Sequence, residues 1–421
     1  MVKRQFGFRA RLALDPVLSR KADDQAHAAR AMWNLLHAWW RMMPKDKRTL
    51  ANADAAIRQA RADIDFLAAL PAQAAQAVLK TYFQAWKNCW AGRAGAPKFK
   101  GRFRSVMAVD VPQGRDLCIA RAHRRWGLVN IPKIGRVRFR WTKDLPIGRR
   151  ADADNRIAGA RLVKDARGWH IAFRVQALEP GPEPHIGPEI GIDMGVAVPL
   201  ALSDGTTYGH GEWLTVKEKA KLLRLERRAA HRRTFRRPDR VTSGRLRATY
   251  DQIAELRAKA KRRALDWQHR TTADIARRYG TVVVEALGIT NMVKSAKGTV
   301  EEPGRNVAQK SGLNRSISAE AWGRTVELLG HKTARRGGVL VQVPAPNTSR
   351  RCSACGVITP GSREDQATFV CKNPECGWSG NADHNASRNI LHLYRMGLAL
   401  VPAAGRAVAR RARRVKPTTA R

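Results

Sequence analysis

The chain has few acidic residues for its length. Its 421 residues include 35 Asp and Glu against 79 Lys and Arg, which gives a formal net charge of +44. A compact fold with so much unbalanced positive charge repels itself unless a polyanion neutralises it. The composition therefore excludes an ordinary metabolic enzyme and favours a nucleic-acid partner. A hydrophobic fraction of 43% excludes a wholly disordered basic tail, and the length suggests roughly two to three domains.

The chain also lacks a long apolar run. The longest apolar stretches, such as residues 339–343 and 398–404, fall well short of the roughly 20 residues that a membrane span needs. Charged residues interrupt any apolar region near the start of the sequence, unlike a secretory signal. We therefore expect a protein of the prokaryotic cytoplasm or nucleoid with no membrane partner.

Cysteine is scarce, and four of the six cysteines occur in one short segment. Two residues separate Cys352 from Cys355, and four residues separate Cys371 from Cys376. Two close pairs are typical of a metal site rather than of a disulfide framework. Four thiolate ligands leave no open coordination position, so we expect one structural Zn²⁺ that takes no part in catalysis. Unliganded or redox-active thiols are the alternative.

The first 180 residues combine strand and helix patterns. Residues 3–14 alternate as a strand does, residues 17–90 have helical spacing, and short alternating runs recur over residues 106–175. We expect a helical bundle followed by a small β-barrel or an open sheet. Four prolines between Glu179 and Glu189 indicate the clearest domain boundary.

Basic residues concentrate in three segments. The loop at residues 92–105 mixes glycines and basic residues with two phenylalanines, which suits binding to phosphates; a solvated linker is the alternative. Residues 217–278, expected as long helices broken near Pro238, carry 21 Lys and Arg against 7 Asp and Glu. The tail at residues 399–421 has seven basic residues and no acid. The candidate nucleic-acid contacts in the loop are Lys98, Lys100, Arg102 and Arg104.

After residue 190 the strand and helix patterns alternate, which is typical of an α/β domain. Residues 191–205 predict two strands joined by a turn, and residues 281–285 and 339–343 predict two more. A helix is expected over about residues 318–335.

Three acids stand beside apolar segments of this domain. Asp193 lies within a buried-strand pattern, Glu285 ends the run Val282-Val283-Val284, and Asp383 begins a helical segment that it could cap. Taken singly, they could be a turn acid, a surface acid at a strand end and a helix cap. A buried carboxylate without a partner is costly, and three hard oxygen ligands in one domain could hold a pair of Mg²⁺ ions.

These motifs in their order resemble a known family. The chain resembles the transposon-encoded TnpB proteins and the related compact type V CRISPR effector nucleases. The motifs that carry the resemblance are GIDMG, VVVEALGITNM, LNRSISAEAWGRTVELLGHK, Thr348-Ser349 through CSACG, SREDQATFVC and NADHNASRNI. The resemblance runs over residues 1–180 and is strongest over about residues 186–395. One departure is the second cysteine pair, which has four intervening residues where many relatives have two. It lengthens the turn and removes no ligand.

The resemblance implies an α/β RNase H-like (RuvC) nuclease domain with an inserted zinc ribbon, a helical recognition lobe and a small β-barrel wedge domain. In such proteins the acids of the three RuvC motifs bind the metals, and the matching positions here are Asp193, Glu285 and Asp383. The implied divisions are a first wedge strand (1–16), the recognition lobe (17–91), the wedge domain (92–180), a linker (181–189), the nuclease core with the first two motifs and the basic helices (190–347), the zinc ribbon (348–380), the third motif (381–398) and the basic tail (399–421).

The function that the resemblance implies is RNA-guided DNA cleavage. Pairing with a guide RNA, from a transposon end or a CRISPR array, would select the double-stranded DNA target. Two Mg²⁺ ions, or Mn²⁺ in their place, would activate the attacking water and stabilise the departing 3′ oxygen, with Asp193 expected at mid-strand as the bridging ligand. Two alternatives stay open. One is a guide-dependent DNA-binding protein with little cleavage, although all three acids are present; the other is a transposase or accessory factor acting without RNA, although the sequence lacks an HUH histidine pair.

Overall fold

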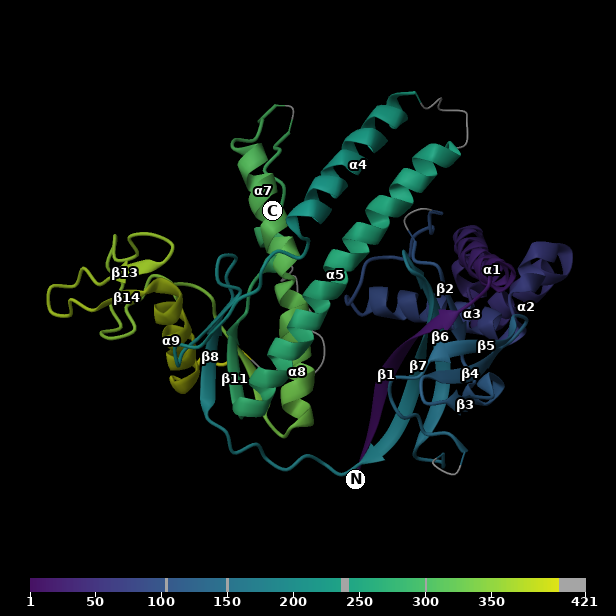
Figure 1. Ribbon diagram of the computed structural model, residues 1–421, viewed down its shortest axis with the longest axis horizontal. Helices are drawn as coiled ribbons and strands as arrows, with labels where there is room; N and C mark the ends of the chain where they lie inside the picture. Colours follow the sequence, from purple (N-terminus) through teal and green to yellow (C-terminus); the bar gives the residue numbers. More distant parts are fainter. Residues whose placement is uncertain (103–104, 149–150, 236–241, 300, 401–421) are drawn as a thin grey trace, which may run out of the picture. The chain divides into compact units, whose positions relative to one another are not determined.

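The computed structural model describes residues 1–421 except 103–104, 149–150, 236–241, 300 and 401–421. The described chain divides into two units (Figure 1): residues 1–180, with which residues 250–258 are grouped, and residues 181–249 together with residues 259–400. Three expectations from the sequence lie outside the described residues. They concern Arg104, the helix break at Pro238 and the basic tail from residue 401.

Seven antiparallel strands of the first unit form one sheet. In spatial order they are β2 (Ala108–Val111), β6 (Arg156–Asp165), β7 (Gly168–Glu179), β1 (Val2–Ala13), β5 (Gly135–Arg140), β4 (Trp126–Ile131) and β3 (Ala120–His123). β1 pairs with β7 and, through Leu12 and Ala13, with β5, so the first segment of the chain is a central strand. In the described residues no ladder joins β2 to β3. The strands therefore pair as an open sheet, not as a closed barrel.

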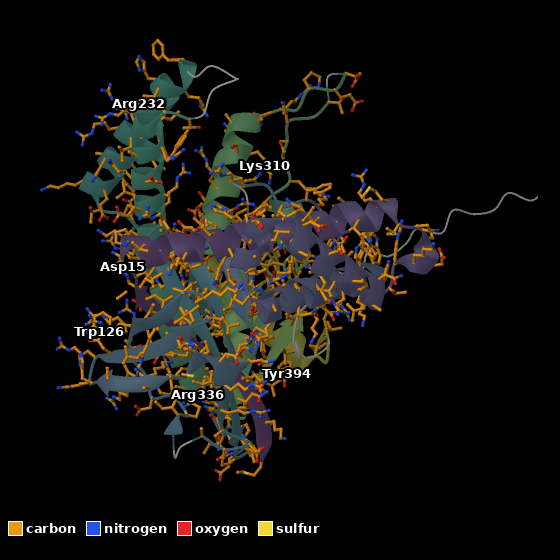
Figure 2. The ribbon with its side chains drawn as sticks, turned by 90° about the vertical axis from the view of Figure 1, so that its right-hand side faces the viewer. Asp15, Trp126, Arg232, Lys310, Arg336 and Tyr394 are labelled. Atoms are coloured by element: carbon orange, nitrogen blue, oxygen red, sulfur yellow. The ribbon has the colours of Figure 1, made fainter. Side chains whose placement is uncertain are left out.

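Three helices precede most of these strands. They are α1 (Pro16–Met42), α2 (Leu50–Asp63) and α3 (Ala72–Trp90), with short 3-10 turns at Lys45–Lys47, Asp65–Ala69 and Gly114–Leu117. Asp15, labelled in Figure 2, caps α1 by accepting hydrogen bonds from the N–H groups of Val17 and Leu18, both at 2.8 Å. The apolar faces of the helices share one continuous core with the sheet, and Trp33, Trp40 and Tyr82 belong to it.

The second unit contains a five-stranded mixed sheet. In spatial order its strands are β10 (Thr207–Tyr208), β9 (Leu200–Leu202), β8 (Glu189–Asp193), β11 (Thr281–Glu285) and β12 (Val339–Val343). β8, β11 and β12 are parallel, whereas β9 and β10 run antiparallel to their neighbours. The strands over residues 281–285 and 339–343 have the bounds that the sequence predicts.

Helices cover both faces of this sheet. The helices of the second unit are α4 (Val216–Thr234), α5 (Gly244–Arg278), α6 (Ile289–Met292), α7 (Val307–Glu320), α8 (Trp322–Arg335) and α9 (Ala382–Arg395). Trp322 and Leu329 of α8 share a core with Ile192 of β8, while Ile390 of α9 packs with Val283 of β11 in a separate core. The sheet is therefore the middle of three layers (Figure 1).

One helix prediction was wrong in its bounds. The single helix expected over about residues 318–335 is two helices, α7 and α8, which meet at Ala321. Ala321 has φ +50°, in the left-handed region, so the helical hydrogen-bond ladder cannot run through it.

The basic helices form an antiparallel hairpin, α4 followed by α5 (Figure 1). Glu218 in the first turn of α4 is bonded to the Thr215 backbone in a capping box and reaches across to Lys259 and, at 2.6 Å, to Arg263 of α5. In the described part of the chain, no helix has the length and apolarity needed to span a membrane.

Candidate functional site

Two of the three predicted acids end neighbouring parallel strands. Asp193 is the last residue of β8 and Glu285 the last residue of β11, and the ladder between them runs up to the pair Val284↔Ile192. Parallel strands bring their carboxyl ends to the same edge of a sheet, where α/β proteins commonly place their sites. Asp193 and Glu285 therefore lie at one edge.

The expectation that Asp193 lies at mid-strand was wrong. β8 and β9 form an antiparallel pair in which Asp193 faces Ala201, and the connecting loop begins directly after Asp193. The side chain therefore stands at the rim of the sheet.

The third acid, Asp383, lies in the first turn of α9. The alternative that Asp383 caps this helix was wrong, because Asn381 does so: its side chain accepts hydrogen bonds from the N–H groups of Asp383 and His384, both at 3.0 Å. Asp383 is not needed for the cap, and its negative charge is favourable near the helix N-terminus.

A close helix–strand contact holds α9 against β8. A side chain at Gly191 would clash with the carbonyl oxygen of Ser387, so only glycine lets the helix pack directly on this strand. The contact joins the element that carries Asp383 to the strand that carries Asp193.

The pKa values of all three carboxyl groups are raised. Burial, together with the charges of Glu285 and Asp383, raises the pKa of Asp193 from 3.8 to about 7. Burial also raises the pKa of Glu285 and of Asp383. Carboxylates gathered in a poorly hydrated place repel one another, and a divalent cation among them would reverse these shifts. The donor set, three hard oxygen ligands, fits Mg²⁺ or Mn²⁺.

Two neighbours of the acids were not singled out from the sequence. The Arg363 guanidinium lies 3.4 Å from Oδ1 of Asp383 and acts against the raised pKa of that group. The Thr348 hydroxyl is hydrogen-bonded to Oε1 of Glu285. Both residues belong to the motifs around the cysteines, and that position is the only sequence signal that could have indicated them.

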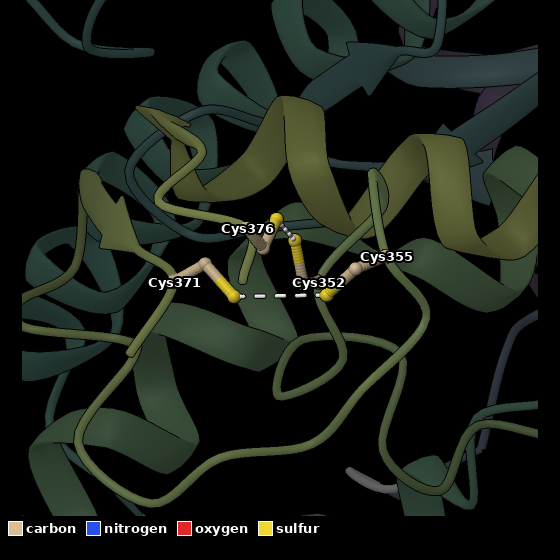
Figure 3. Close-up of side chains that lie close together, drawn as sticks. All are labelled: Cys352, Cys355, Cys371 and Cys376. Atoms are coloured by element: carbon tan, nitrogen blue, oxygen red, sulfur yellow. Dashed lines mark hydrogen bonds between the residues drawn. The ribbon is translucent and has the colours of Figure 1, made fainter. Parts of the chain in front are cut away.

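The four cysteine sulfurs converge (Figure 3). Cys352 Sγ lies 3.8 Å from Cys376 Sγ, and Cys355 Sγ lies 3.7 Å from Cys371 Sγ. All four sulfurs lie within 4.8 Å of one another. A tetrahedral ion with metal–sulfur bonds of about 2.3 Å requires sulfur–sulfur distances of about 3.8 Å. The cluster therefore fits a four-thiolate metal site, and the longer second pair supplies both of its ligands.

This compactness distinguishes the cysteines from the acids. Among the described residues, no other group of three or more His, Cys, Asp or Glu side chains has its ligand atoms all within 4.8 Å of one another. The carboxylates of Asp193, Glu285 and Asp383 are thus more widely spaced than the thiols. The two short strands beside the cysteines, β13 (Thr368–Val370) and β14 (Ser379–Asn381), pair with each other, and β14 leads directly into α9.

The loop residues predicted to bind nucleic acid differ in their surroundings. Asn34 holds the Lys100 backbone through two hydrogen bonds of 2.7 and 3.1 Å, and the Lys100 ammonium lies 3.6 Å from the centre of the Trp33 ring. Burial lowers the pKa of Lys100 to about 8. Lys98 and Arg102 are exposed. Of these three, Lys100 is therefore the least suited to contact a phosphate.

Two family models match the segments that contain the three acids and the four cysteines. A family model described as "Probable transposase" matches residues 172–296, which include Asp193 and Glu285. A model described as "Cas12f1-like, TNB domain" matches residues 322–390, which include the four cysteines and Asp383.

Two relatives match most of the chain. The putative RNA-guided DNA endonuclease InsQ of Escherichia coli (strain K12) is 31% identical over 321 residues, covering 76% of this chain and 74% of the relative. A putative RNA-guided DNA endonuclease of Streptomyces pristinaespiralis is 24% identical over 335 residues, covering 78% and 73%. Among solved structures, the Cas12f1 protein in a complex with sgRNA and target DNA has a similar fold. Its TM-score is 0.52 at 15% identity, over 90% of this chain and 83% of that one.

Proposed function

Since the chain belongs to the TnpB family, that of the putative RNA-guided DNA endonuclease InsQ, we propose that it cuts DNA at sites selected by a bound guide RNA. The protein would supply shape, charge and the hydrolytic centre, and base pairing would supply the sequence specificity.

One observation carries the catalytic part of this proposal. Asp193, Glu285 and Asp383 come from three separated motifs, and burial together with the charges of the other two acids raises the pKa of Asp193. Divalent cations bound there would supply an activated water and stabilisation of the leaving oxygen. Asp193 is the best candidate for a ligand shared between two ions, because, besides burial, the charges of both other acids raise its pKa.

The fold supports the further proposal of an RNase H-like (RuvC) nuclease domain. Three parallel strands, two antiparallel strands and helices on both faces bring Asp193 and Glu285 to one edge, and α9 packs on the strand that carries Asp193. In the same scheme α1, α2 and α3 would form the recognition lobe, and the seven-stranded sheet would form the wedge domain. The divisions given for the sequence remain proposals of this kind.

The cysteine cluster supports a proposed structural zinc. Its sulfur–sulfur distances fit Zn²⁺, and four thiolates leave no position for a water or a substrate. The bound ion would fix the two turns of the segment between β12 and α9 and would not take part in hydrolysis.

The net charge of +44 supports the proposed nucleic-acid partners. Lys98 and Arg102 are the exposed candidates on the described part of the loop, and the hairpin of α4 and α5 adds a larger basic surface. Phosphate contacts of this kind give affinity without sequence preference, so a guide RNA is needed to account for a defined target.

The decisive test is cleavage with and without RNA. The protein is purified from cells that express it with its flanking DNA, the RNA that copurifies is sequenced, and a plasmid carrying the matching target is incubated in Mg²⁺ buffer. We expect cleavage with the RNA and none after ribonuclease treatment. Equal, sequence-specific cleavage by the RNA-free protein would reject the guided function and favour a transposase or a stand-alone nuclease.

A further inference from the structure

We propose that Thr348 is a positioning residue for Glu285, and that its hydroxyl orients the Glu285 carboxylate toward a bound divalent cation. The inference rests on the proposed function, because it takes Glu285 to be a metal ligand. It assigns a role to a residue outside the three acids and the four cysteines.

The contact between the two side chains is buried. Thr348 is 3% exposed and Glu285 is 8% exposed, and the Thr348 hydroxyl is hydrogen-bonded to Oε1 of Glu285. The hydroxyl has a second acceptor within reach, the carbonyl oxygen of Ala345 at 3.0 Å, but it carries only one proton. Charge-assisted hydrogen bonds are the stronger ones, so the hydroxyl donates to Glu285 whenever that carboxylate is ionised, as a metal ligand must be.

The hydrogen bond leaves the two oxygens of Glu285 in different situations. Oε1 accepts from Thr348, whereas Oε2 has no hydrogen-bond donor within the described part of the chain. A carboxylate held at one oxygen cannot rotate freely, and its other oxygen keeps a constant direction. Glu285 is thereby prepared to bind a cation through Oε2.

Thr348 is itself held in place by α9. Asn389 donates from Nδ2 to the carbonyl oxygens of Thr348, at 2.9 Å, and Arg351, at 2.6 Å. Asn385 donates to the same Arg351 oxygen at 2.7 Å and accepts from the N–H of Ser353 at 2.7 Å. Both asparagines are buried, at 2% and 0% exposure.

This network connects two of the acids. α9 carries Asp383 in its first turn and, two and six residues later, Asn385 and Asn389, the asparagines that fix the segment of Thr348. The position of the Glu285 carboxylate is therefore defined relative to the helix that presents Asp383. A site whose ligands come from separate elements needs such a connection to hold them at metal-binding distances.

The test compares Thr348→Val, which keeps the shape and removes the hydroxyl, with Thr348→Ser, which keeps the hydroxyl. Thr333→Val is the matched control, because Thr333 is fully buried and the hydrogen bonds of its hydroxyl, among the described residues, go to the backbone of its own helix at Leu329 and Gly330. Mn²⁺ binding to the full-length protein is measured by electron paramagnetic resonance, and the Mg²⁺ concentration for half-maximal cleavage is measured on the RNA-bound protein.

Loss of a residue that orients a metal ligand costs about 10- to 100-fold in metal affinity. We expect Thr348→Val to weaken Mn²⁺ binding and to raise the required Mg²⁺ by that factor, and Thr348→Ser and Thr333→Val to stay close to the wild type. Unchanged Mn²⁺ affinity in Thr348→Val, or equal losses in Thr348→Val and Thr348→Ser, would overturn the inference. If Thr348→Val fails to fold, Thr348→Ala removes the same hydroxyl and is measured in its place.

The acid variants separate this inference from the proposed function. If Glu285→Ala still cleaves DNA, the nuclease centre itself is wrongly assigned. If Glu285→Ala is inactive and Thr348→Val behaves as the wild type, only the positioning role of Thr348 is rejected.

Discussion

The guanidinium of Arg363 lies 3.4 Å from Oδ1 of Asp383, so the segment between the two cysteine pairs directly contacts the third acid. Thr348, four residues before Cys352, contacts Glu285. The cysteine cluster thus lies in a stretch of chain that touches two of the three acids. A metal that only fixes this stretch would still affect the proposed nuclease centre through the position of these two side chains.

The first prediction concerns the zinc. Elemental analysis of the purified protein should find about one zinc per chain, since four converging thiolates fit a single ion. Cys352→Ser should lower the zinc content and the yield of folded protein, because the metal contributes folding free energy. Cys89→Ser and Cys118→Ser, at cysteines outside the cluster, should leave the zinc content unchanged. Freshly purified, active protein without zinc would contradict the assignment.

The second prediction concerns the three acids. Replacing Asp193, Glu285 or Asp383 with Ala should lower the cleavage rate about 100-fold or more, since metal ions contribute several kcal/mol to such reactions. Binding of guide and target should remain, because in the proposed mechanism the acids would act only at the reacting phosphate. Asp266→Asn is the control, because Asp266 is an exposed acid paired with Arg270. Substantial cleavage by Asp383→Ala would remove Asp383 from the site.

The third prediction concerns pH. The pKa of Asp193 is about 7 in the folded, metal-free protein against an ordinary value of 3.8, so between these values the folded state binds more protons than the unfolded state. The free energy of unfolding should therefore fall as the pH rises through this window, by at most about 4 kcal/mol from this group.

Chemical denaturation of the metal-free protein at several pH values checks this dependence. Asp193→Asn should flatten it, and a divalent cation should suppress it in the wild type, because the ion takes the place of the proton. If the free energy of unfolding of the wild type rises steadily with pH over the same window, the pKa of Asp193 is not raised in the folded protein.

Part of the fold and of the site could be predicted from the sequence. The strands at residues 281–285 and 339–343 have their predicted bounds because buried parallel strands appear as uninterrupted runs of β-branched residues. The convergence of the four cysteines could be expected from their spacing, since two close pairs are typical of a metal site.

Tertiary contacts explain what the sequence did not reveal. Ala321 has no feature that predicts its positive φ, so the division between α7 and α8 was missed. Asn381 and Asp383 are both good capping residues, and only the backbone geometry selects Asn381. Thr348 and Glu285 are far apart in the sequence, and their contact depends on how α9 holds the intervening segment. Local patterns carry no information about such a contact.

The fourth prediction distinguishes two lysines of the same loop. Lys98 is exposed, so Lys98→Met should weaken nucleic-acid binding. The slope of the logarithm of affinity against the logarithm of salt concentration should decrease in magnitude by about 1, the contribution of one phosphate contact. Lys100 packs its ammonium on Trp33, so Lys100→Met should leave the salt dependence unchanged. Binding to a labelled RNA at several salt concentrations tests both variants. Equal effects of the two substitutions would refute the distinction.

The last prediction concerns the protein without RNA. Its charge of +44 far exceeds what a short DNA duplex would neutralise, so the RNA-free protein should be poorly soluble at low salt and should bind DNA with little sequence preference. Because such binding depends on the release of counterions, its affinity should fall steeply as salt increases. Adding the RNA occupies much of the basic surface and transfers the choice of target to base pairing. Binding to matched and mismatched duplexes should then differ strongly and depend less on salt. The measurement is the affinity for both duplexes over a salt series, with and without RNA. A strong preference of the RNA-free protein for the matched duplex would mean that its own side chains recognise the sequence, and the excess positive charge would need another partner.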